Sequence, residues 1–255
     1  MNRPLFSVIT PVYNSKPTLQ KTLDSVFLQP EELWECIVVD GGSADGTVDL
    51  LRREERITWV SEPDNGIYDA MNKGIRMASG SYLYFLGAGD SMRAGVLSKL
   101  RPLMPPNELS LVYGNVCTSN GLVYDGAFTK SKLARLNICH QAALYGRKVF
   151  ELLGCYNTKY CVYADHEFNI RCLGDPRIQT RYVNLVLADY EPGGFSSCHP
   201  DTAFLRDRLD LIRTHLGTGI FLREYARHLI GRALPQSIKR RITRLEGGPH
   251  QVVTD

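Results

Sequence analysis

The chain has 255 residues, of which 44% are hydrophobic and 22% are charged, so it can bury a full core. Its size fits one α/β domain, or one such domain with an appendage. The formal net charge of +3 is too small for the whole surface to bind a polyanion, which argues against a nucleic-acid partner and restricts any electrostatic contact to a local patch.

Residues 1–100 alternate compact apolar runs with segments whose apolar residues recur at helical spacing. This alternation predicts strand-helix-strand units and a largely parallel sheet. The expected strands are 5–10, 36–39, 57–60 and 82–86. Helices are expected between them, around residues 19–27, 48–53 and 67–78.

Polar side chains follow the ends of these strands. In an open α/β sheet, ligands bind at the carboxyl ends of the strands. We therefore expect one crevice to be faced by Asn14, Asp40, Glu62, Asp64 and Asp90. Four acidic side chains at one sheet edge are the main clue to a functional site.

The pattern changes after residue 112. Short β-like pieces separated by Asn- and Gly-containing turns extend to about residue 136 and predict a smaller mixed β region. Helices are expected at 148–153 and 163–172, and a strand at 181–187. After Pro200 the apolar residues return to helical spacing, which predicts a C-terminal helical appendage.

The seven cysteines are scattered, odd in number and contain no C-x-x-C pair. They favour neither a disulfide framework nor a zinc site, and the cytoplasm is the expected compartment. Residues 4–10 are too short for a signal-peptide core, and no apolar run approaches the ~18 to 20 residues of a membrane span.

Four segments, taken together and in order, resemble the family 2 inverting glycosyltransferases, especially bacterial members of colanic-acid, O-antigen and capsule assembly. They are residues 6–14, 38–47, 61–75 and 85–90. The resemblance implies a GT-A fold with a Rossmann-like, mostly parallel sheet. It also implies a catalytic domain over 1–198, with a nucleotide-sugar half (1–100) and an acceptor half (101–198), followed by the helical tail 199–255.

The resemblance places the donor nucleoside at Thr10, Pro11 and Tyr13. An aromatic ring beside a rigid proline turn offers a flat surface to a base, although Tyr13 considered alone would be interpreted as packing. Asp40 matches the family carboxylate that binds the base or ribose, and an acceptor-only group suits that role. Its alternative is an Asx-turn that closes Gly41 and Gly42, and the two roles can coexist.

Three further residues are assigned to the donor by the same resemblance. Asp64 lies in the loop that contacts the nucleotide, while Asp69 and Asn72 lie on the following helix, where capping or structural roles are the alternatives. The turn at 41–47 lacks the lysine of a P-loop and the glycine pattern of a dinucleotide fold. We therefore interpret it as strand-to-helix turn chemistry.

Gly89 and Asp90 are expected at the donor diphosphate. A carboxylate that holds Mg²⁺ or Mn²⁺ neutralises the leaving group, so the sequence predicts a divalent cation here. The family usually has D-x-D or D-D, whereas this chain has Ala88 and Gly89 before the last carboxylate. The second protein ligand could be His199 or His140, or there could be none.

Residues 163–171 resemble the family segment that carries the catalytic base, with Ala164 in place of its usual first acid. Asp165 is then the base that takes the proton of the acceptor hydroxyl. At a predicted helix start it could instead be an N-cap. Glu167 and Arg171 are candidate acceptor-positioning groups, although their i, i+4 spacing also permits a simple ion pair.

His140 and Gln141 resemble the family's acceptor-side segment, near the diphosphate or the acceptor sugar. Residues 193–196 resemble a loop that orders over the donor. The tail from 223 to 244 interleaves basic and apolar residues. It could lie on an anionic membrane surface, or pack its apolar side on the domain with a solvated charged face.

These features predict an inverting enzyme that transfers a sugar from a nucleotide-sugar, with UDP as the expected nucleotide, to a lipid-linked glycan acceptor, in the cytoplasm or at the cytoplasmic face of the inner membrane. Two alternatives remain. One is a nucleotidyltransferase, against which the first turn lacks a Gly- and Lys/Arg-rich loop. The other is a non-catalytic nucleotide-sugar-binding or scaffold protein, which Ala88 and Ala164 keep open.

Overall fold

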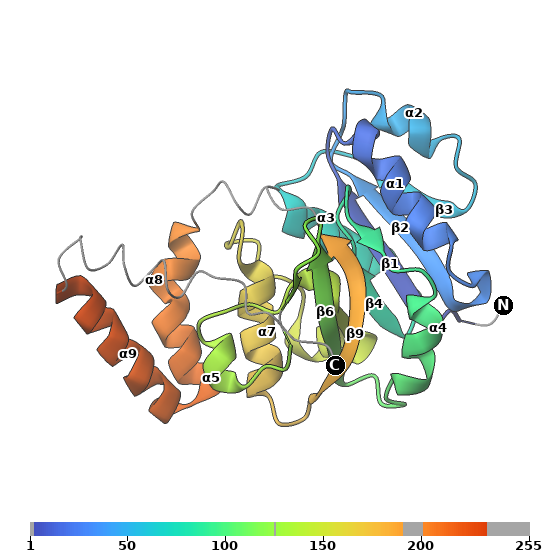
Figure 1. Cartoon of the computed structure of the whole chain (residues 1–255). Coiled ribbons are helices and arrows are strands. Elements are labelled where there is room, and N and C mark those ends of the chain that lie inside the picture. The colour runs from blue at the N-terminus through green and yellow to red at the C-terminus, as the bar shows by residue number, and fades with distance from the viewer. Residues whose placement is uncertain (1–2, 125, 191–200, 234–255) are drawn as a thin grey trace.

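The computed structural model describes residues 3–124, 126–190 and 201–233, in which nine strands form one sheet flanked by helices (Figure 1). The first half of the sheet is parallel, in the order β3-β2-β1-β4. Its strands are β1 (Phe6–Val12), β2 (Trp34–Asp40), β3 (Ile57–Ser61) and β4 (Tyr82–Phe85). The prediction of an α/β fold with a largely parallel sheet is confirmed.

The second half of the sheet is mixed. β8 runs antiparallel to both β4 and β6, and β9 runs parallel to β6 with register shifts beside Asn115. The short strands β5 and β7 pair antiparallel to β9 and β6. The bounds are β5 (Ser91–Met92), β6 (Ser110–Thr118), β7 (Val123–Tyr124), β8 (Ala143–Gly146) and β9 (Gln179–Tyr190).

The parallel strands are apolar on both faces because both faces are covered. Along β1, Val8 belongs to the cluster under α1, whereas Ile9 belongs to the cluster under α3. Proline at the start of α1 suits the first helical turn, where no backbone N–H is needed. The helices of this half are α1 (Lys16–Phe27), α2 (Thr47–Leu51), α3 (Ile67–Met77) and α4 (Val96–Leu100), with the short 3₁₀ turns η1 (Glu31–Leu33) and η2 (Arg101–Leu103).

An aromatic cluster joins the second half to the sheet. Phe150 of α6 stacks on Phe168 of α7 with ring centroids 4.6 Å apart, and Tyr145 of β8 meets Phe168 edge-on at 5.4 Å. These rings are buried, so they fix the position of α7 against the sheet. The elements here are α5 (Lys130–Leu133), the 3₁₀ turn η3 (His140–Ala142), α6 (Arg147–Leu153) and α7 (Ala164–Gly174).

The helices expected after Pro200 are present. They are α8 (Thr202–Leu211), the π-turn η5 (Ile212–Leu216) and α9 (Thr218–Ala233). Phe204, Ile212 and Leu216 are buried in the same apolar cluster as α3 and α7. None of the helices in the part of the chain that the structure describes is long and apolar enough to cross a membrane.

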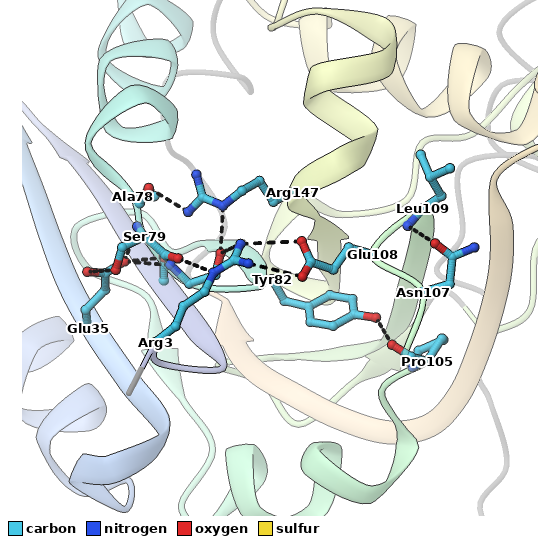
Figure 2. Close-up of polar contacts among 12 residues, drawn as sticks. Arg3, Glu35, Ala78, Ser79, Tyr82, Pro105, Asn107, Glu108, Leu109 and Arg147 are labelled. Carbon is cyan, nitrogen blue, oxygen red and sulfur yellow. Dashed lines mark hydrogen bonds and ion pairs between the residues drawn. The ribbon is translucent and has the colours of Figure 1, made fainter. Parts of the chain in front are cut away.

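A polar network ties the chain together at the amino ends of β1 and β4 (Figure 2). Arg3 pairs with Glu108 at 3.2 Å, and Arg147 donates to the carbonyl of Gly80 at 3.0 Å. Glu35 accepts from the hydroxyl of Ser79 at 2.9 Å. These charges are satisfied by one another and by backbone, so this edge supports the fold and leaves the opposite edge for function.

Candidate functional site

The carboxyl ends of β1, β2 and β4 meet at one edge of the sheet because the three strands are parallel neighbours. Asn14 and Asp40 lie at the ends of β1 and β2, and Asp90 follows β4. The backbone N–H of Gly41 bonds to the carbonyl of Val12 at 2.9 Å, which holds the first two turns together. The sequence-based placement of these polar residues at one edge is confirmed.

Asp40 is fully buried and closes its own turn. Its Oδ2 accepts from the backbone N–H groups of Gly42 and Ser43 at 3.1 and 3.0 Å and from the hydroxyl of Ser61 at 2.6 Å. The hydroxyl of Ser43 bonds to Oδ1. The Asx-turn that the sequence left open is therefore present, and the base-binding role of Asp40 stays a prediction.

The turn after β1 exposes a ring and strains one backbone position. Tyr13 is 64% exposed, as a surface for stacking requires. Asn14 has φ of 46°, a left-handed conformation that asparagine tolerates, and its side-chain oxygen accepts from Ala44 N–H at 2.9 Å. Thr10 and Pro11 are buried, and the hydroxyl of Thr10 has no hydrogen-bond partner within the described ranges. A buried unpaired hydroxyl is unusual and points to a missing polar neighbour.

Asp64 lies directly against the Asp40 turn. A Cβ added at Gly41 would come within 2.5 Å of Asp64 Oδ2, so only glycine permits this approach. Asp64 Oδ1 accepts from the N–H of Gly66 at 2.8 Å, and Asp69 Oδ2 accepts from the N–H of Asn65 at 3.0 Å. Asp64 thus lies beside the Asp40 turn and Asp69 holds the loop at the start of α3, while the donor contacts of both residues stay predictions.

Asn72 has a structural role instead of the predicted donor contact. It is buried, its Nδ2 donates to the carbonyl of Tyr156 at 2.9 Å, and its Oδ1 accepts from the N–H of Tyr156 at 3.0 Å. Both ends of the amide are therefore used to fasten α3 to the connection between α6 and α7. The alternative that the sequence left open is the one that the contacts favour.

Asp90 is buried at the end of β4, and its Oδ2 accepts from Gln141 Nε2 at 2.7 Å. The side chain turns back over Gly87, where a Cβ would come within 2.9 Å of the same oxygen. Gly89 has φ of 109°, and Thr22 of α1 bonds to its N–H at 2.9 Å and to the Asp90 carbonyl at 2.8 Å. The loop is thus anchored to α1 and presents one carboxylate.

Asp165 is buried at the second position of α7 and does not cap the helix, whose N-cap residue is Tyr163. Its Oδ1 accepts from the hydroxyl of Tyr68 at 2.8 Å, and its Oδ2 accepts from Asn137 Nδ2 at 2.8 Å. His140 Nδ1 lies 3.7 Å from Oδ2. Polar groups from two distant segments, α3 and residues 137–140, therefore converge on this carboxylate.

These neighbours keep Asp165 ionised. Burial acts to raise its pKa, but the polar interaction with His140 and the hydroxyl of Tyr68 outweigh burial, and the pKa is lowered below the ordinary value. Conversely, burial and the charge of Asp165 raise the pKa of Tyr68 far above its usual range. Tyr68 therefore stays neutral, and its one hydroxyl proton is shared between Asp165 Oδ1 and the carbonyl of Val162 at 2.7 Å.

The turn η3 connects the two carboxylates. His140 contacts Asp165, and the next residue, Gln141, donates to Asp90. Gln141 is itself held, because its carbonyl accepts from the hydroxyl of Tyr84 at 2.6 Å. Consecutive residues thus link the carboxylate at the end of β4 with the carboxylate at the start of α7. The predicted role of His140 and Gln141 near the diphosphate or the acceptor sugar stays a prediction.

Glu167 and Arg171 pair with each other, so their predicted acceptor contact is not supported. Arg171 Nε lies 2.8 Å from Glu167 Oε1, and both side chains are mostly buried. The guanidinium also donates to the carbonyls of Leu153 at 2.6 Å and Cys155 at 3.3 Å. The i, i+4 pair therefore fastens α7 to the end of α6.

Asp90 is the one predicted protein ligand for a divalent cation that the described residues contain at this edge of the sheet. Nowhere in residues 3–124, 126–190 and 201–233 do three His, Cys, Asp or Glu side chains cluster as a metal site. Asp90 alone fits the mode in which Mg²⁺ takes one or two carboxylates and completes its shell with phosphate and water. His199 and the loop 193–196 lie outside the described residues.

The sequence reading missed Tyr68, Asn137 and Asn169. Asn137 Oδ1 accepts from Asn169 Nδ2 at 2.9 Å, and Asn169 Oδ1 accepts from the hydroxyl of Tyr145 at 2.8 Å, so a chain of bonds leads to Asp165. Tyr68 lies inside one of the four family-like segments, which was the signal available for it. Nothing local in the sequence marked Asn137.

The chain belongs to the family described as "Glycosyl transferase family 2", whose sequence model matches residues 7–153. It has the GT-A fold and is a glycosyltransferase. A relative from Mycobacterium bovis (strain BCG / Pasteur 1173P2), named "PGL/p-HBAD biosynthesis glycosyltransferase", is 41% identical over 216 residues, which cover 81% of this chain and 84% of the relative.

Two solved structures share the fold. TarS 1-349 of S. aureus in complex with UDP-GlcNAc gives a TM-score of 0.63 at 17% identity over 82% of this chain and 64% of that chain. Mannosyltransferase PcManGT from Pyrobaculum calidifontis, in complex with GDP-Man and Mn²⁺, gives 0.60 at 21% identity over 84% and 63%. The chain thus spans less than two thirds of the length of either structure.

Proposed function

We propose that the protein is an inverting glycosyltransferase that moves a sugar from a nucleotide-sugar, with UDP as the nucleotide, to a lipid-linked glycan acceptor in bacterial surface polysaccharide assembly. The single observation that carries the proposal is the turn η3, which contacts a donor-side carboxylate and a base-side carboxylate through consecutive residues. A relative named "PGL/p-HBAD biosynthesis glycosyltransferase" and a fold neighbour solved in complex with UDP-GlcNAc support it.

The donor nucleotide is assigned to the carboxyl ends of β1 and β2. Tyr13 offers an exposed ring for the base, and the unpaired hydroxyl of Thr10 offers a polar contact. Asp40 and Asp64, the second of which lies against Gly41, suit ribose or base N–H and O–H groups, since an ionised carboxylate only accepts hydrogen bonds. The exposed ring, the buried Asp40 and the half-buried Asp64 together suit a nucleoside.

Asp90 is the residue assigned to a divalent cation, Mg²⁺ or Mn²⁺. A bound cation would neutralise the charge of the departing diphosphate. The fit is that of a single protein carboxylate, oriented by Gln141 Nε2 at 2.7 Å, with the remaining ligands drawn from the donor and water. A fold neighbour is known in complex with Mn²⁺, which supports the same assignment.

Asp165 is assigned as the base. Its lowered pKa keeps it ionised at neutral pH, and it takes the proton of the acceptor hydroxyl as that oxygen attacks the anomeric carbon. The neighbouring donors Tyr68 and Asn137 hold the carboxylate in one orientation. Attack opposite the leaving diphosphate inverts the anomeric centre, so an α-linked donor gives a β-glycoside.

The test is an assay of nucleotide release and sugar transfer with a panel of UDP- and GDP-sugars and membrane-extracted acceptor lipids, with and without EDTA. We expect transfer with a UDP-sugar, loss of transfer in EDTA and restoration by Mn²⁺ or Mg²⁺. The variant Asp90→Asn should raise the cation concentration needed for half-maximal rate. The anomeric configuration of the product, read from its NMR coupling constant, decides inversion.

Two other outcomes would replace the proposal. Binding of a UDP-sugar without hydrolysis or transfer to any extracted acceptor would favour a non-catalytic nucleotide-sugar-binding protein, which the alanines at 88 and 164 would explain. Pyrophosphate release from a nucleoside triphosphate would favour a nucleotidyltransferase. We also propose that the protein is cytoplasmic and acts at the cytoplasmic face of the membrane that holds the acceptor. Cell fractionation can test this location.

A further inference from the structure

Helix α9 lies next to α8, at the end of the molecule opposite β3 (Figure 1). Ile220 and Phe221 are half-buried against the main apolar cluster. Glu224 is buried, and its carboxylate lies 3.4 Å from Arg208 of α8. These three residues define the inner side of α9.

The other side of α9 exposes large apolar side chains. Leu222, Tyr225, Leu229 and Ile230 are between 43% and 58% exposed and recur at helical spacing, so they form one face, which we name the α9 outer face. The other large exposed apolar side chains within the described ranges lie singly on separate elements; they are Tyr13, Leu28, Leu136 and Leu205. An apolar stripe of this kind on one helix indicates a binding surface.

The charges around the α9 outer face have one sign. The acidic residue in the α9 sequence is Glu224, which is buried under Arg208 and Arg227. Arg223 and His228 are exposed and, at about 100° per residue, lie on opposite flanks of the stripe. The face therefore presents apolar side chains bordered on one flank by the cationic Arg223 and on the other by the polar ring of His228.

We propose that the α9 outer face docks on the surface of a membrane that contains anionic phospholipids. An amphipathic helix with an apolar stripe and basic flanks lies in the membrane interface, where its apolar residues enter the boundary of the acyl chains and its basic residues meet the headgroups. The apolar side of α9 faces away from the domain, so the alternative that it packs inward does not describe this helix.

Charge complementarity favours lipid over the other occupants. A second copy would add another Arg223 of the same charge to the contact, which costs free energy. Residues 234–255 contain four Lys or Arg and two Asp or Glu, so that segment has the same sign as Arg223. An anionic headgroup layer is the surface of opposite sign. Docking would also bring the enzyme to a lipid-linked acceptor. This last consequence rests on the proposed function, whereas the docking surface itself does not.

The first test is co-sedimentation of the full chain with vesicles. We expect binding to vesicles with 30% phosphatidylglycerol, little binding to pure phosphatidylcholine, and weakening by 0.5 M NaCl because salt screens the headgroup charge. The double variant Leu222→Ser with Leu229→Ser should bind about tenfold more weakly, and Arg223→Gln about fivefold more weakly. Leu28→Ser, which removes an exposed leucine from the end of α1, is the control.

A second measurement identifies the occupant. Tryptophan fluorescence of Leu229→Trp, after subtraction of the wild-type signal, should shift to the blue only when anionic vesicles are added. A shift that grows with protein concentration would assign the face to a second copy. A spectrum that is blue-shifted without vesicles and at every protein concentration would assign the face to the chain's own tail. Either result, or wild-type protein that ignores anionic vesicles, overturns the proposal.

The membrane-docking proposal and the proposed function can be tested separately. The Leu222→Ser, Leu229→Ser variant should retain donor hydrolysis in detergent solution, because the α9 outer face is remote from the carboxylates. Loss of vesicle binding with retained hydrolysis supports the docking surface. Vesicle binding by a protein that transfers no sugar would leave the surface standing and remove the catalytic proposal.

Discussion

Asp40 and Asp165 are both buried carboxylates with several hydrogen-bond donors, yet they are held in different ways. The donors of Asp40 come from its own turn and from the neighbouring strand, at Gly42, Ser43 and Ser61. The donors of Asp165 come from α3 and from the loop before η3, and Tyr68 is 97 residues away in sequence. One environment is local and the other is assembled by the fold.

The difference predicts different responses to change. A local turn re-forms whenever its strand forms, so substitutions there alter the turn and its ligand contacts. A carboxylate held by distant donors depends on the relative position of α3, η3 and α7. Its pKa and orientation therefore report on the packing of the whole second half against the sheet.

The largest effect is expected for Asp165→Asn. An amide cannot take the proton of the acceptor, so kcat should fall by about 10²- to 10⁴-fold while donor binding is retained. Transfer kinetics and donor titration measure the two quantities. Asp175→Asn, at the far end of α7, is the control and should keep full activity. Full activity in Asp165→Asn would remove the base assignment.

Asp40→Asn should act on binding and stability. It removes the charge from bonds to two backbone N–H groups and two hydroxyls, and bonds to charged groups contribute about 1.5 to 3 kcal/mol each. We expect the donor dissociation constant to rise about tenfold, with a lower melting temperature and an unchanged kcat at saturating donor. Calorimetric titration with UDP measures the dissociation constant. An unchanged affinity would mean that Asp40 stabilises the turn and does not contact the nucleotide.

Tyr68→Phe tests the assembled environment through pH. The hydroxyl of Tyr68 helps to lower the pKa of Asp165, so its removal should raise that pKa and move the acidic limb of kcat/KM to higher pH, with a several-fold loss of rate at neutral pH. Because the folded pKa is lowered, the stability that Asp165 contributes is present above its unfolded pKa and is lost as pH falls through the folded one.

For that experiment Tyr82→Phe is the matched control, since Tyr82 is also buried and bonds to Pro105 at the opposite edge of the sheet (Figure 2). It should leave the pH profile in place. A Tyr68→Phe profile that coincides with the wild-type profile would show that the hydroxyl does not tune Asp165.

The smallest effect is expected for Ser61→Ala. It removes one of four donors from Asp40 and leaves the three bonds within the turn. A single hydrogen bond contributes about 1 kcal/mol net, so denaturant unfolding should show a loss near that size, with donor affinity changed less than threefold. A larger loss of affinity would mean that the β3 side of the site orients Asp40 as much as its own turn does.

The sequence alone predicted the parallel strands, the helices between them and the carboxylates at the strand ends. The spacing of the apolar residues predicts the buried strands and the amphipathic helices. The glycine and serine residues that follow Asp40 predict the turn there. The order β4-β8-β6-β9 and the pairing of β5 with β9 were not predictable in this way, because strand pairing depends on contacts between segments far apart in the chain.

The candidate site shows the same difference between local and long-range information. The sequence named Asp90, Asp165, His140 and Gln141, but only the tertiary structure decided that η3 connects the two carboxylates. It also decided that Asn72 and the pair of Glu167 with Arg171 serve packing, because their polar groups meet backbone carbonyls and amides of other segments. Local patterns determine which residues carry charge, and long-range packing determines which of those charges is left to act on a ligand.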